Sequence, residues 1–485
     1  MNSAARQRLI LVIAAISVFF EALDIAIANL TMPLIQQDFG LSATEVQWVQ
    51  TLYVLLYGGL LILGGRLADT VGRKRVFLLA SGIFLLTSLG AGLAPSFGWL
   101  LVARGWQGVG AALLMPAALS LVTNAYTEAG ARSRAIGVVS AFAAVGSGSG
   151  LSLGGLVAGG WGWQAVFFLN VPVILLTLAL GARFIPADPP RREALPDIPS
   201  GLLLTGIITA LSYGVHELAG WRQHGALLLG LGAAILAGGW AFRRRNARQA
   251  VPLVDFRVLA PARTAIGVYV CLGASFTGFL FLISLLLQHD QHRTAAQAGL
   301  LLFPFSALSA VTGKWLIPTL LRRGLTVGSL AVLGMGALTL SAGWLLVLHW
   351  VPGSQWPLLL AMACANGLGI ALAYSGLTVL ALQGVPEAYH GLATGVATTA
   401  YFVGGGLGLS VLSLVLNPAT AGGGPVVGPV PLAVLGLYGG IGAGWLLLAR
   451  WRPPRGSGRA WQQNSLAATG GAAPGQGRSS AALRR

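Results

Sequence analysis

The stretch Gly65-Arg66-Leu67-Ala68-Asp69-Thr70-Val71-Gly72-Arg73-Lys74-Arg75 lies between two apolar runs, at residues 48–64 and 76–94. Each run approaches the ~20 residues that a helix needs to cross the hydrocarbon of a bilayer. The stretch is therefore expected to be a short, charged connector at a membrane surface. Its two glycines permit a tight turn, and its one acid and four basic groups stand where two helices end and begin.

The same apolar pattern continues through most of the chain. Of 485 residues, 55% are hydrophobic and only 9% are charged, whereas soluble domains carry ~25% charged residues. Lipid admits only helices and closed barrels, and the ~10-residue alternating strands of a barrel are absent. The sequence therefore predicts an all-α polytopic membrane protein with fourteen spans. They are expected near residues 9–32, 48–64, 76–94, 99–122, 135–160, 165–185, 201–220, 225–242, 264–288, 298–321, 326–349, 356–382, 391–416 and 430–449.

The net charge of +17 would suggest nucleic acid in a soluble protein, but the distribution of the charge argues against that partner. All but four of the 30 Lys and Arg lie in the terminal segments or in alternate loops on one side. The four exceptions are Arg104, Arg222, Arg293 and Lys314. Cytoplasmic loops carry such an excess, so both termini are expected in the cytoplasm, with the protein in the plasma membrane. The bilayer itself is then the partner of these arginines.

The connector resembles a known motif. Its pattern G-x-L-x-D-x-x-G-R-K is similar to the loop between the second and third helices of the major facilitator superfamily of transporters. The resemblance implies two bundles of six helices that rock about a central site. It also implies a gating loop, in which Asp69 and Arg73 help to close the cytoplasmic side. Gly65, Gly72 and Lys74 complete this loop.

The first span contains two acids, Glu21 and Asp24, one helical turn apart. Each ionisable group at membrane depth costs roughly 2.5 to 3.5 kcal/mol on insertion scales, so their shared face is expected to look into a protein or water-filled interior. They form either a proton or cation site or a structural polar contact. The run L-D-x-x-I-x-N-x-x-x-P that begins at Leu23 resembles the first-helix signature of the drug:proton antiporter branch with fourteen spans.

The fourth span contains Arg104 and Gln107 in a run that resembles the R-x-x-Q-G-x-G-x-A pattern of the same transporters. Arg104 lies about five residues, or ~8 Å, below the outer surface, and Asp24 about eight residues, or ~12 Å. The two side chains are therefore expected to meet. An arginine favours the ionised carboxylate, whereas apolar surroundings favour the protonated form, and a proton switch requires this competition. The alternative is that Arg104 extends to the outer surface.

The fifth span carries Gly146, Gly150 and Gly154 on one stripe, with Gly155 beside it. Small residues four apart let another helix approach closely. The stripe resembles the antiporter motif G-x-x-x-G-P-x-x-G-G, except that Leu151 stands where the motif has proline. The close packing is expected to survive this change, but the kink that a proline would supply is not.

The fourteen spans are most simply read as six, two inserted and six, supported by weak internal similarity. The predicted units are an N-terminal bundle at 1–185, a linker with two inserted helices at 186–258, a C-terminal bundle at 259–450, and a disordered cytoplasmic tail at 451–485.

In the second bundle, Asn366, Tyr374 and Tyr401 stand among apolar neighbours and are candidates for a substrate cavity. Hydrogen bonds between helices explain each of them equally well. His289 and His292 lie in an outer loop, and we expect no metal there. No nucleophile and base pair or phosphate-binding loop is recognisable, so an enzyme is not expected.

The resemblance implies a proton-coupled exporter of small amphipathic compounds. We expect the proton gradient to drive it without a cofactor, and we expect a monomer. Two alternatives stay open. One is an uptake symporter or uniporter for a metabolite, because Leu151 replaces the motif proline. The other is a membrane sensor or assembly partner that does not transport.

Overall fold

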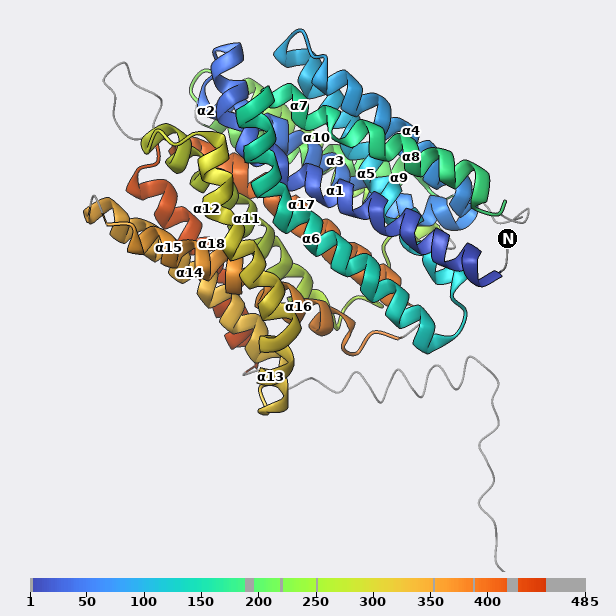
Figure 1. Cartoon of the computed structure of the whole chain (residues 1–485). Coiled ribbons are helices and arrows are strands. Elements are labelled where there is room, and N and C mark those ends of the chain that lie inside the picture. The colour runs from blue at the N-terminus through green and yellow to red at the C-terminus, as the bar shows by residue number, and fades with distance from the viewer. Residues whose placement is uncertain are drawn as a thin grey trace, which may run out of the picture.

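The computed structural model describes residues 3–187, 196–218, 221–249, 252–351, 354–386, 389–416 and 426–450. The tail predicted at 451–485 lies outside these residues, as does most of the charged linker after residue 187. Every regular element in the described ranges is a helix (Figure 1). A helix satisfies its own backbone hydrogen bonds, which hydrocarbon cannot do. The predicted all-α polytopic fold is confirmed.

Three groups of helices follow one another along the chain. The first six spans comprise α1 (Ser3–Phe39), α2 (Ala43–Val46), α3 (Trp48–Thr70), α4 (Arg73–Gly92), α5 (Phe97–Ala125), α6 (Ala129–Trp161), α7 (Trp163–Phe168) and α8 (Asn170–Phe184). The inserted pair is α9 (Ile198–Glu217) and α10 (Gly225–Arg248). The last six spans comprise α11 (Arg263–Leu285), η2 (Leu286–Asp290), α12 (Ala295–Val311), η3 (Thr312–Leu316), α13 (Ile317–Arg322), α14 (Val327–Trp350), α15 (Trp356–Met362), η4 (Ala363–Gly369), α16 (Ile370–Leu382), α17 (His390–Val415) and α18 (Pro429–Arg450).

In the described residues, 13 helices are long and apolar enough to cross a membrane, and a bent pair within α6 supplies a fourteenth. The predicted number of fourteen spans is therefore confirmed. The bend in α6 was not expected. Its two parts, Arg134–Ser147 and Ser152–Trp161, meet at 45° although Leu151 stands in the proline position. Backbone flexibility at the glycine-rich break accounts for a bend without proline.

The connector is also more helical than the sequence suggested. Helix α3 continues to Thr70 and α4 begins at Arg73, so only Val71 and Gly72 lie between them. Gly72 has a φ of 120°, a conformation that favours glycine and turns the chain sharply. The charged groups therefore lie on the ends of two helices rather than on a loop.

The two groups of six spans lie side by side, with α6 of the first group packed along α12 of the second (Figure 1). On the side predicted to face outward, α1 also packs against α11. Hydrogen bonds cross between the groups at these ends. Ser284 Oγ donates to the Asn29 carbonyl (2.8 Å), Gln288 Nε2 to the Leu30 carbonyl (3.1 Å), and Ser152 Oγ to the Gly299 carbonyl (3.1 Å). The outer ends of the two groups are therefore closed against each other.

The inserted helix α9 lies against both groups, because it packs on α3 and on α17. Its partner α10 packs mainly on α9 and turns Leu229 and Leu236 outward, each more than three-quarters exposed. Such leucines suit contact with lipid. The boundaries predicted for the three units, at 185 and 258, stay a prediction.

At the predicted cytoplasmic side, a polar cluster of Asp197, Ser200, Arg245 and Gln249, called here the polar clasp, joins α9 to α10. Asp197 caps α9 by accepting from the Ser200 backbone and hydroxyl, and it also accepts from Arg245 Nε (2.8 Å) and Gln249 Nε2 (3.2 Å) on the side of α10. Burial acts to raise the pKa of Asp197, but the bonds from Ser200 and Arg245 outweigh it and lower that pKa below its ordinary 3.8. The ionised carboxylate is therefore the form that holds the clasp.

We expect Asp197→Ala to lower the unfolding free energy at pH 7 by about 1 kcal/mol, the typical cost of losing a helix cap. When the pKa of a carboxyl is lower in the folded state than in the unfolded state, the carboxyl stabilises the fold at pH values above its unfolded-state pKa. This stabilisation is lost as the pH falls through the folded-state pKa. The difference from the parent should therefore shrink between pH 4 and pH 2. Thermal unfolding in detergent across this range checks it. Glu128→Ala is the control, because Glu128 caps α6 without a side-chain bond; an equal loss at pH 2 and pH 7 contradicts the assignment.

Candidate functional site

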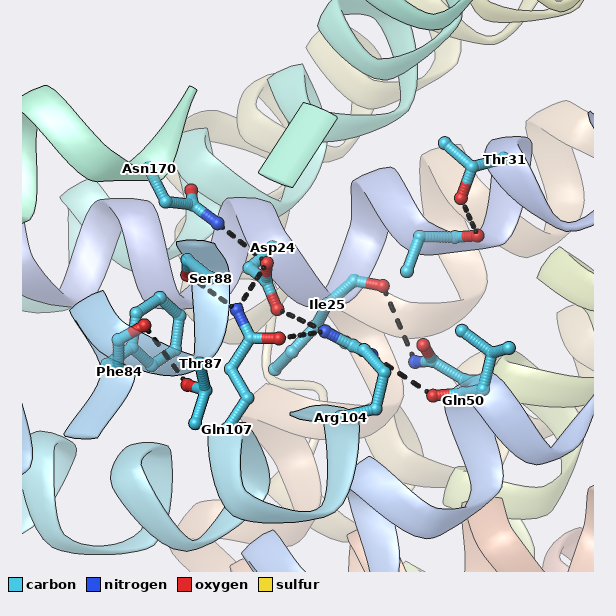
Figure 2. A network of polar contacts seen from close by, with 12 residues as sticks. Asp24, Ile25, Thr31, Gln50, Phe84, Thr87, Ser88, Arg104, Gln107 and Asn170 are labelled. Carbon is cyan, nitrogen blue, oxygen red and sulfur yellow. Dashed lines mark hydrogen bonds and ion pairs between the residues drawn. The ribbon is translucent and has the colours of Figure 1, made fainter. Parts of the chain in front are cut away.

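The centre of the polar site is Asp24, a fully buried carboxylate in the middle of α1. Figure 2 shows the side chains around it. Arg104 Nη1 donates to Asp24 Oδ2 at 2.7 Å, while Asn170 Nδ2 (2.7 Å) and Gln107 Nε2 (3.1 Å) both donate to Oδ1. Helices α1, α5 and the start of α8 therefore converge on one carboxylate. The predicted meeting of Asp24 and Arg104 is present.

Arg104 is held in place by more than its counter-charge. It is fully buried, its Nε donates to the Val49 carbonyl at 3.1 Å, and its guanidinium lies 4.2 Å from the centre of the Tyr53 ring. The alternative in which Arg104 extends to the outer surface is wrong for this structure. Its Nη2 nitrogen has no hydrogen-bond partner among the described residues, so the two N–H groups on this nitrogen remain available as donors.

Gln107 links the ion pair to a third helix. Its Oε1 accepts from Arg104 Nη1 at 2.8 Å, and its Nε2 donates to Ser88 Oγ of α4 at 2.9 Å as well as to Asp24 (Figure 2). A glutamine is suited to this position because one amide offers both an acceptor and two donors. The ion pair is thereby fixed from three sides. In a buried pair of this kind, removing one partner leaves an uncompensated charge and costs about 3 to 5 kcal/mol.

Asn170 was not predicted as part of this site. It is fully buried at the first position of α8, directly after the short helix α7. The available signal was the run Asn170-Val171-Pro172 at the start of an apolar span. An amide there faces hydrocarbon or protein and therefore needs a polar partner.

We expect Asn170→Leu to slow transport by about 10- to 150-fold, because a hydrogen bond to a charged group contributes ~1.5 to 3 kcal/mol and its loss leaves Asp24 with one donor fewer. The slope of transport against pH should change as well, because Asn170 bonds the carboxylate itself. Initial rates in proteoliposomes at pH 6, 7 and 8 measure both effects. Asn246→Leu serves as the control, since this buried asparagine bonds only backbone groups of Val254 near α10. A parent-like pH profile in Asn170→Leu contradicts a part for Asn170 in this site.

Glu21 lies outside the network around Asp24. Its side chain is 3% exposed, and its Oε1 has no hydrogen-bond partner among the described residues. The Tyr57 hydroxyl of α3 lies within hydrogen-bonding reach of the carboxyl, next to Met115 Sδ at 3.2 Å. The two acids therefore lie in different surroundings. Asp24 accepts hydrogen bonds from three side chains, whereas Glu21 keeps an oxygen without a hydrogen-bond partner among the described residues.

The fold agrees with what comparison with known proteins shows. A family model described as the Major Facilitator Superfamily matches residues 14–409. The chain belongs to the Major Facilitator Superfamily. The match begins within α1 and ends within α17, so it includes all the residues of the Asp24 network.

Among the relatives of this facilitator are several proteins named for resistance or export. It is 31% identical over 414 residues to the multidrug resistance protein Stp of Mycobacterium tuberculosis, a match that covers 84% of this chain and 76% of the relative. It is 34% identical over 433 residues to the cephamycin export protein CmcT of Amycolatopsis lactamdurans, covering 85% of each. It is 35% identical over 425 residues to the puromycin resistance protein pur8 of Streptomyces alboniger, a match that covers 85% of this chain and 82% of the relative.

Solved structures of proteins with low sequence identity to this chain have a similar fold. The crystal structure of the POT family transporter PepTSo aligns with a TM-score of 0.67 over 94% of this chain and 98% of that chain, at 16% identity. An auto-inhibited POT family peptide transporter aligns with the same TM-score at 18% identity, over 93% and 98%. At these identities the likeness concerns the fold alone. The facilitator architecture predicted from the connector is confirmed.

The glycine stripe of this facilitator faces two different helices. A Cβ at Gly146, Gly150 or Gly154 would collide with α1, at Phe19, Leu23 and Ile27 respectively. A Cβ at Gly155 would instead collide with the Ala295 carbonyl and come within 3.0 Å of Gly299 Cα, both in α12. Three glycines therefore hold α6 against the helix that carries Glu21 and Asp24. Gly155 lets the two groups of six spans meet.

Arg73 and Lys74 of the connector bind within the first six spans, whereas Arg66 Nη2 donates to the Pro252 carbonyl after α10 at 3.4 Å. Arg73 Nε donates to Ser120 Oγ of α5 at 2.7 Å and lies 3.9 Å from Asp69, and Lys74 Nζ donates to the Ala182 and Ile185 carbonyls at 2.8 and 2.7 Å. Gly65 has space around it, since the nearest atom to an added Cβ is Pro116 Cβ at 3.8 Å. These contacts join α3, α4, α5 and α8 on the predicted cytoplasmic side. A gating role for this connector stays a prediction.

The predicted cavity residues divide into two places. Tyr374 of α16 and Tyr401 of α17 lie edge to face, with ring centres 6.1 Å apart. Asn366 of η4 instead donates to Ser306 Oγ of α12 at 2.9 Å, as expected for a hydrogen bond between helices. Among the described residues, no group of three or more His, Cys, Asp or Glu side chains could hold a metal ion.

Proposed function

We propose that this facilitator is a proton-coupled secondary transporter that exports small amphipathic compounds across the plasma membrane. The observation that carries the proposal is the fully buried ion pair between Asp24 and Arg104. An ion pair within a membrane span is costly and marks a functional site by default. The relatives named for cephamycin export and for resistance to puromycin or to many drugs support export as the direction.

The proton would act on Asp24 by releasing Arg104. A protonated carboxyl no longer balances the guanidinium, so the arrangement with Asn170 and Gln107 loses most of its electrostatic stabilisation. Protonation then favours a second arrangement of α1 and α5, provided that this arrangement solvates the neutral acid better. The ends predicted to face outward are packed together, and the side chains of the network are fully buried. Proton entry from outside would therefore accompany the opening of the outer contacts between α1 and α11.

Several properties belong to the same proposal. The proton gradient supplies the energy, and no cofactor, metal or catalytic step is involved. The protein works as a monomer, with both termini in the cytoplasm and without nucleic acid as a partner. The small-molecule cargo would reach the region between the two groups of six spans, where inverted facilitator repeats place their binding sites.

The test is the direction of coupled movement. Purified protein reconstituted in liposomes should couple the downhill movement of protons to the movement of puromycin in the opposite direction. Movement of drug and proton in the same direction would instead identify a symporter. The absence of any movement of puromycin, lincomycin, ethidium and a peptide library, with a folded protein, would favour a sensor or assembly partner.

A further inference from the structure

The inserted pair has no part in the Asp24 network, yet one of its helices lies at the boundary between the two groups of six spans. Helix α3 of the first group packs directly on α17 of the second group, and α9 packs on both of them. Helix α10 packs mainly on α9. The pair is therefore attached to the rest of the protein chiefly through α9, which covers the seam between α3 and α17.

The contact of α9 with α3 is close because glycines lie on both sides of it. A Cβ at Gly59 of α3 would lie 2.7 Å from Thr205 Oγ1 of α9. A Cβ at Gly201 of α9 would lie 2.8 Å from Leu63 Cδ2 of α3. Each helix thus places a side chain where the other helix has none. Helices that interlock in this way lose many van der Waals contacts when they separate, so we expect α9 and α3 to move together.

The contact of α9 with α17 is polar near the predicted outer end. The hydroxyls of Ser212 in α9 and Ser410 in α17 lie 2.7 Å apart, and both side chains are fully buried. Ser410 Oγ donates its one hydrogen to the Gly406 carbonyl at 3.2 Å, so Ser212 is the donor between the two hydroxyls. One turn further along α9, His216 Nδ1 lies 3.4 Å from Ser413 Oγ of α17.

The last turn of α9 also touches the first group. His216 Nδ1 lies 3.4 Å from Gln47 Nε2, directly before α3, and the His216 ring centre lies 5.4 Å from that of Trp48. The outer end of α9 therefore contacts both groups while their outer ends are packed together. A hydrogen bond such as that from Ser212 is lost once the two oxygens move apart by about 1 Å. The polar contact with α17 is thus the one that yields first when the groups rock.

We propose that α9 is a tie that stabilises the closed outer ends of the protein. It stays with α3 throughout the transport cycle, while its bond from Ser212 to Ser410 forms when the outer ends close and breaks when they open. An element that contacts both groups must release one of them when the groups rotate relative to each other. The inference rests on the proposed transport function for its cycle of two states, and it assigns the inserted pair a task in that cycle.

Two engineered disulfides test which contact is released. Both are built in the full-length chain with its two native cysteines replaced, and puromycin transport is measured in proteoliposomes before and after reduction. Ser212→Cys with Ser410→Cys joins α9 to α17 and should lower transport at least about tenfold, with recovery on reduction, because the cycle passes through both states. Leu63→Cys with Gly201→Cys joins α9 to α3, where Leu63 Cβ lies 3.1 Å from a Cβ added at Gly201. Transport should then stay within about twofold of the reduced protein, because this disulfide joins two helices that move together.

Loss of maleimide labelling shows that each disulfide has formed. Unchanged transport with the disulfide between α9 and α17 in place overturns the proposal, because these helices then have no need to part. Loss of transport with the disulfide between α9 and α3 contradicts it as well, since the tie is expected to move with α3.

Ser212→Ala tests the bond without a transport assay. Spin labels on cysteines placed at Trp161 and Trp356, both exposed at the predicted outer ends, report the separation of the two groups. The ratio of closed to open outer ends should fall about 2- to 10-fold, the effect of losing one neutral hydrogen bond. Thr209→Val is the control on α9, because the Thr209 hydroxyl is buried and has no hydrogen-bond partner among the described residues. A parent-like ratio in Ser212→Ala contradicts the tie, and this measurement decides if a disulfide does not form.

Failure of the tie and failure of transport are separable. The spin labels report on the outer ends whether or not any drug moves. A protein that exports puromycin with α9 joined to α17 retains the proposed function and loses this inference. A protein that moves no puromycin, but whose outer ends open in Ser212→Ala and not in Thr209→Val, retains the tie and loses the proposed function.

Discussion

Replacing Asp24 by Asn is expected to abolish efflux driven by a pH gradient, lowering the coupled rate by at least about a hundredfold. Asparagine keeps an oxygen for Asn170 and Gln107 but cannot bind or release a proton, and it removes the counter-charge of Arg104. The measurement is drug movement in proteoliposomes with and without an imposed gradient. Exchange of drug at equal pH on both sides should persist, since exchange needs the binding site but not the proton.

The matched control for this change is Asp38→Asn in the same helix. Asp38 accepts a hydrogen bond from Trp163 Nε1 at 2.9 Å near the predicted outer end of α1, and asparagine can still accept it. Coupled efflux should therefore remain close to that of the parent. If Asp24→Asn leaves efflux as sensitive to the gradient as in the parent, the assignment of proton coupling to this carboxyl is wrong.

The free energy of unfolding should also depend on the ion pair between Asp24 and Arg104. The Asp24→Asn protein is expected to lose about 3 to 5 kcal/mol of unfolding free energy, because a buried guanidinium is left without its charge partner. Arg104→Met together with Asp24→Asn should recover part of that loss, since the double change removes both charges and an apolar chain fills similar volume. Thermal unfolding of the two variants in one detergent compares them directly.

The second large effect is expected at Gly155, where α6 meets α12. Gly155→Val would place methyl groups against the Ala295 carbonyl and Gly299, and overpacking at a close helix contact costs about 1 to 3 kcal/mol. This cost applies only to the state with closed outer ends, so the variant should favour the opened state. Transport should fall by about 5- to 100-fold, because the cycle passes through both states.

Spin labels can test this shift without a transport assay. Cysteines placed at Trp161 and Trp356, both exposed at the predicted outer ends of the two groups, report their separation once Cys271 and Cys364 have been replaced. Gly155→Val should lengthen the distance between the labels. Gly137→Val is the control on the same helix, since no atom lies within 4 Å of a Cβ there. An unchanged distance in Gly155→Val contradicts the closing role of this contact.

The encounter of Asp24 with Arg104 could be predicted because span depth is readable from sequence. Each residue of a helix adds a fixed rise, so counting from the span ends set both side chains at similar depth. The remaining members could not be placed in this way. Asn170 and Ser88 come from spans whose rotation about their own axes depends on packing against neighbours. The carbonyl of Val49 carries no sequence signal at all, since every residue has one.

The separation of Glu21 from Asp24 shows the same limit. One helical turn places both acids on a common face, and this face looks inward as the cost of burial requires. Which neighbours meet each acid depends on the crossing of α1 with α3 and α5. Glu21 lies only three residues before Asp24, yet it lies beside Tyr57 and outside the network of donors around Asp24. The bend in α6 without a proline has a similar origin, because glycines permit a bend and only packing decides that it occurs.

Composition and apolar run length determined by themselves that this chain crosses a membrane about fourteen times, because the hydrocarbon imposes its thickness and polarity on any sequence that enters it. The resemblance of the connector motif indicated the facilitator family. Only the tertiary structure decided which polar side chains share a site, that Gly155 rather than Gly146 joins the two groups of spans, and that Glu21 lies beside Tyr57. These features depend on helix rotation and crossing, which close packing between distant segments sets and local sequence does not encode.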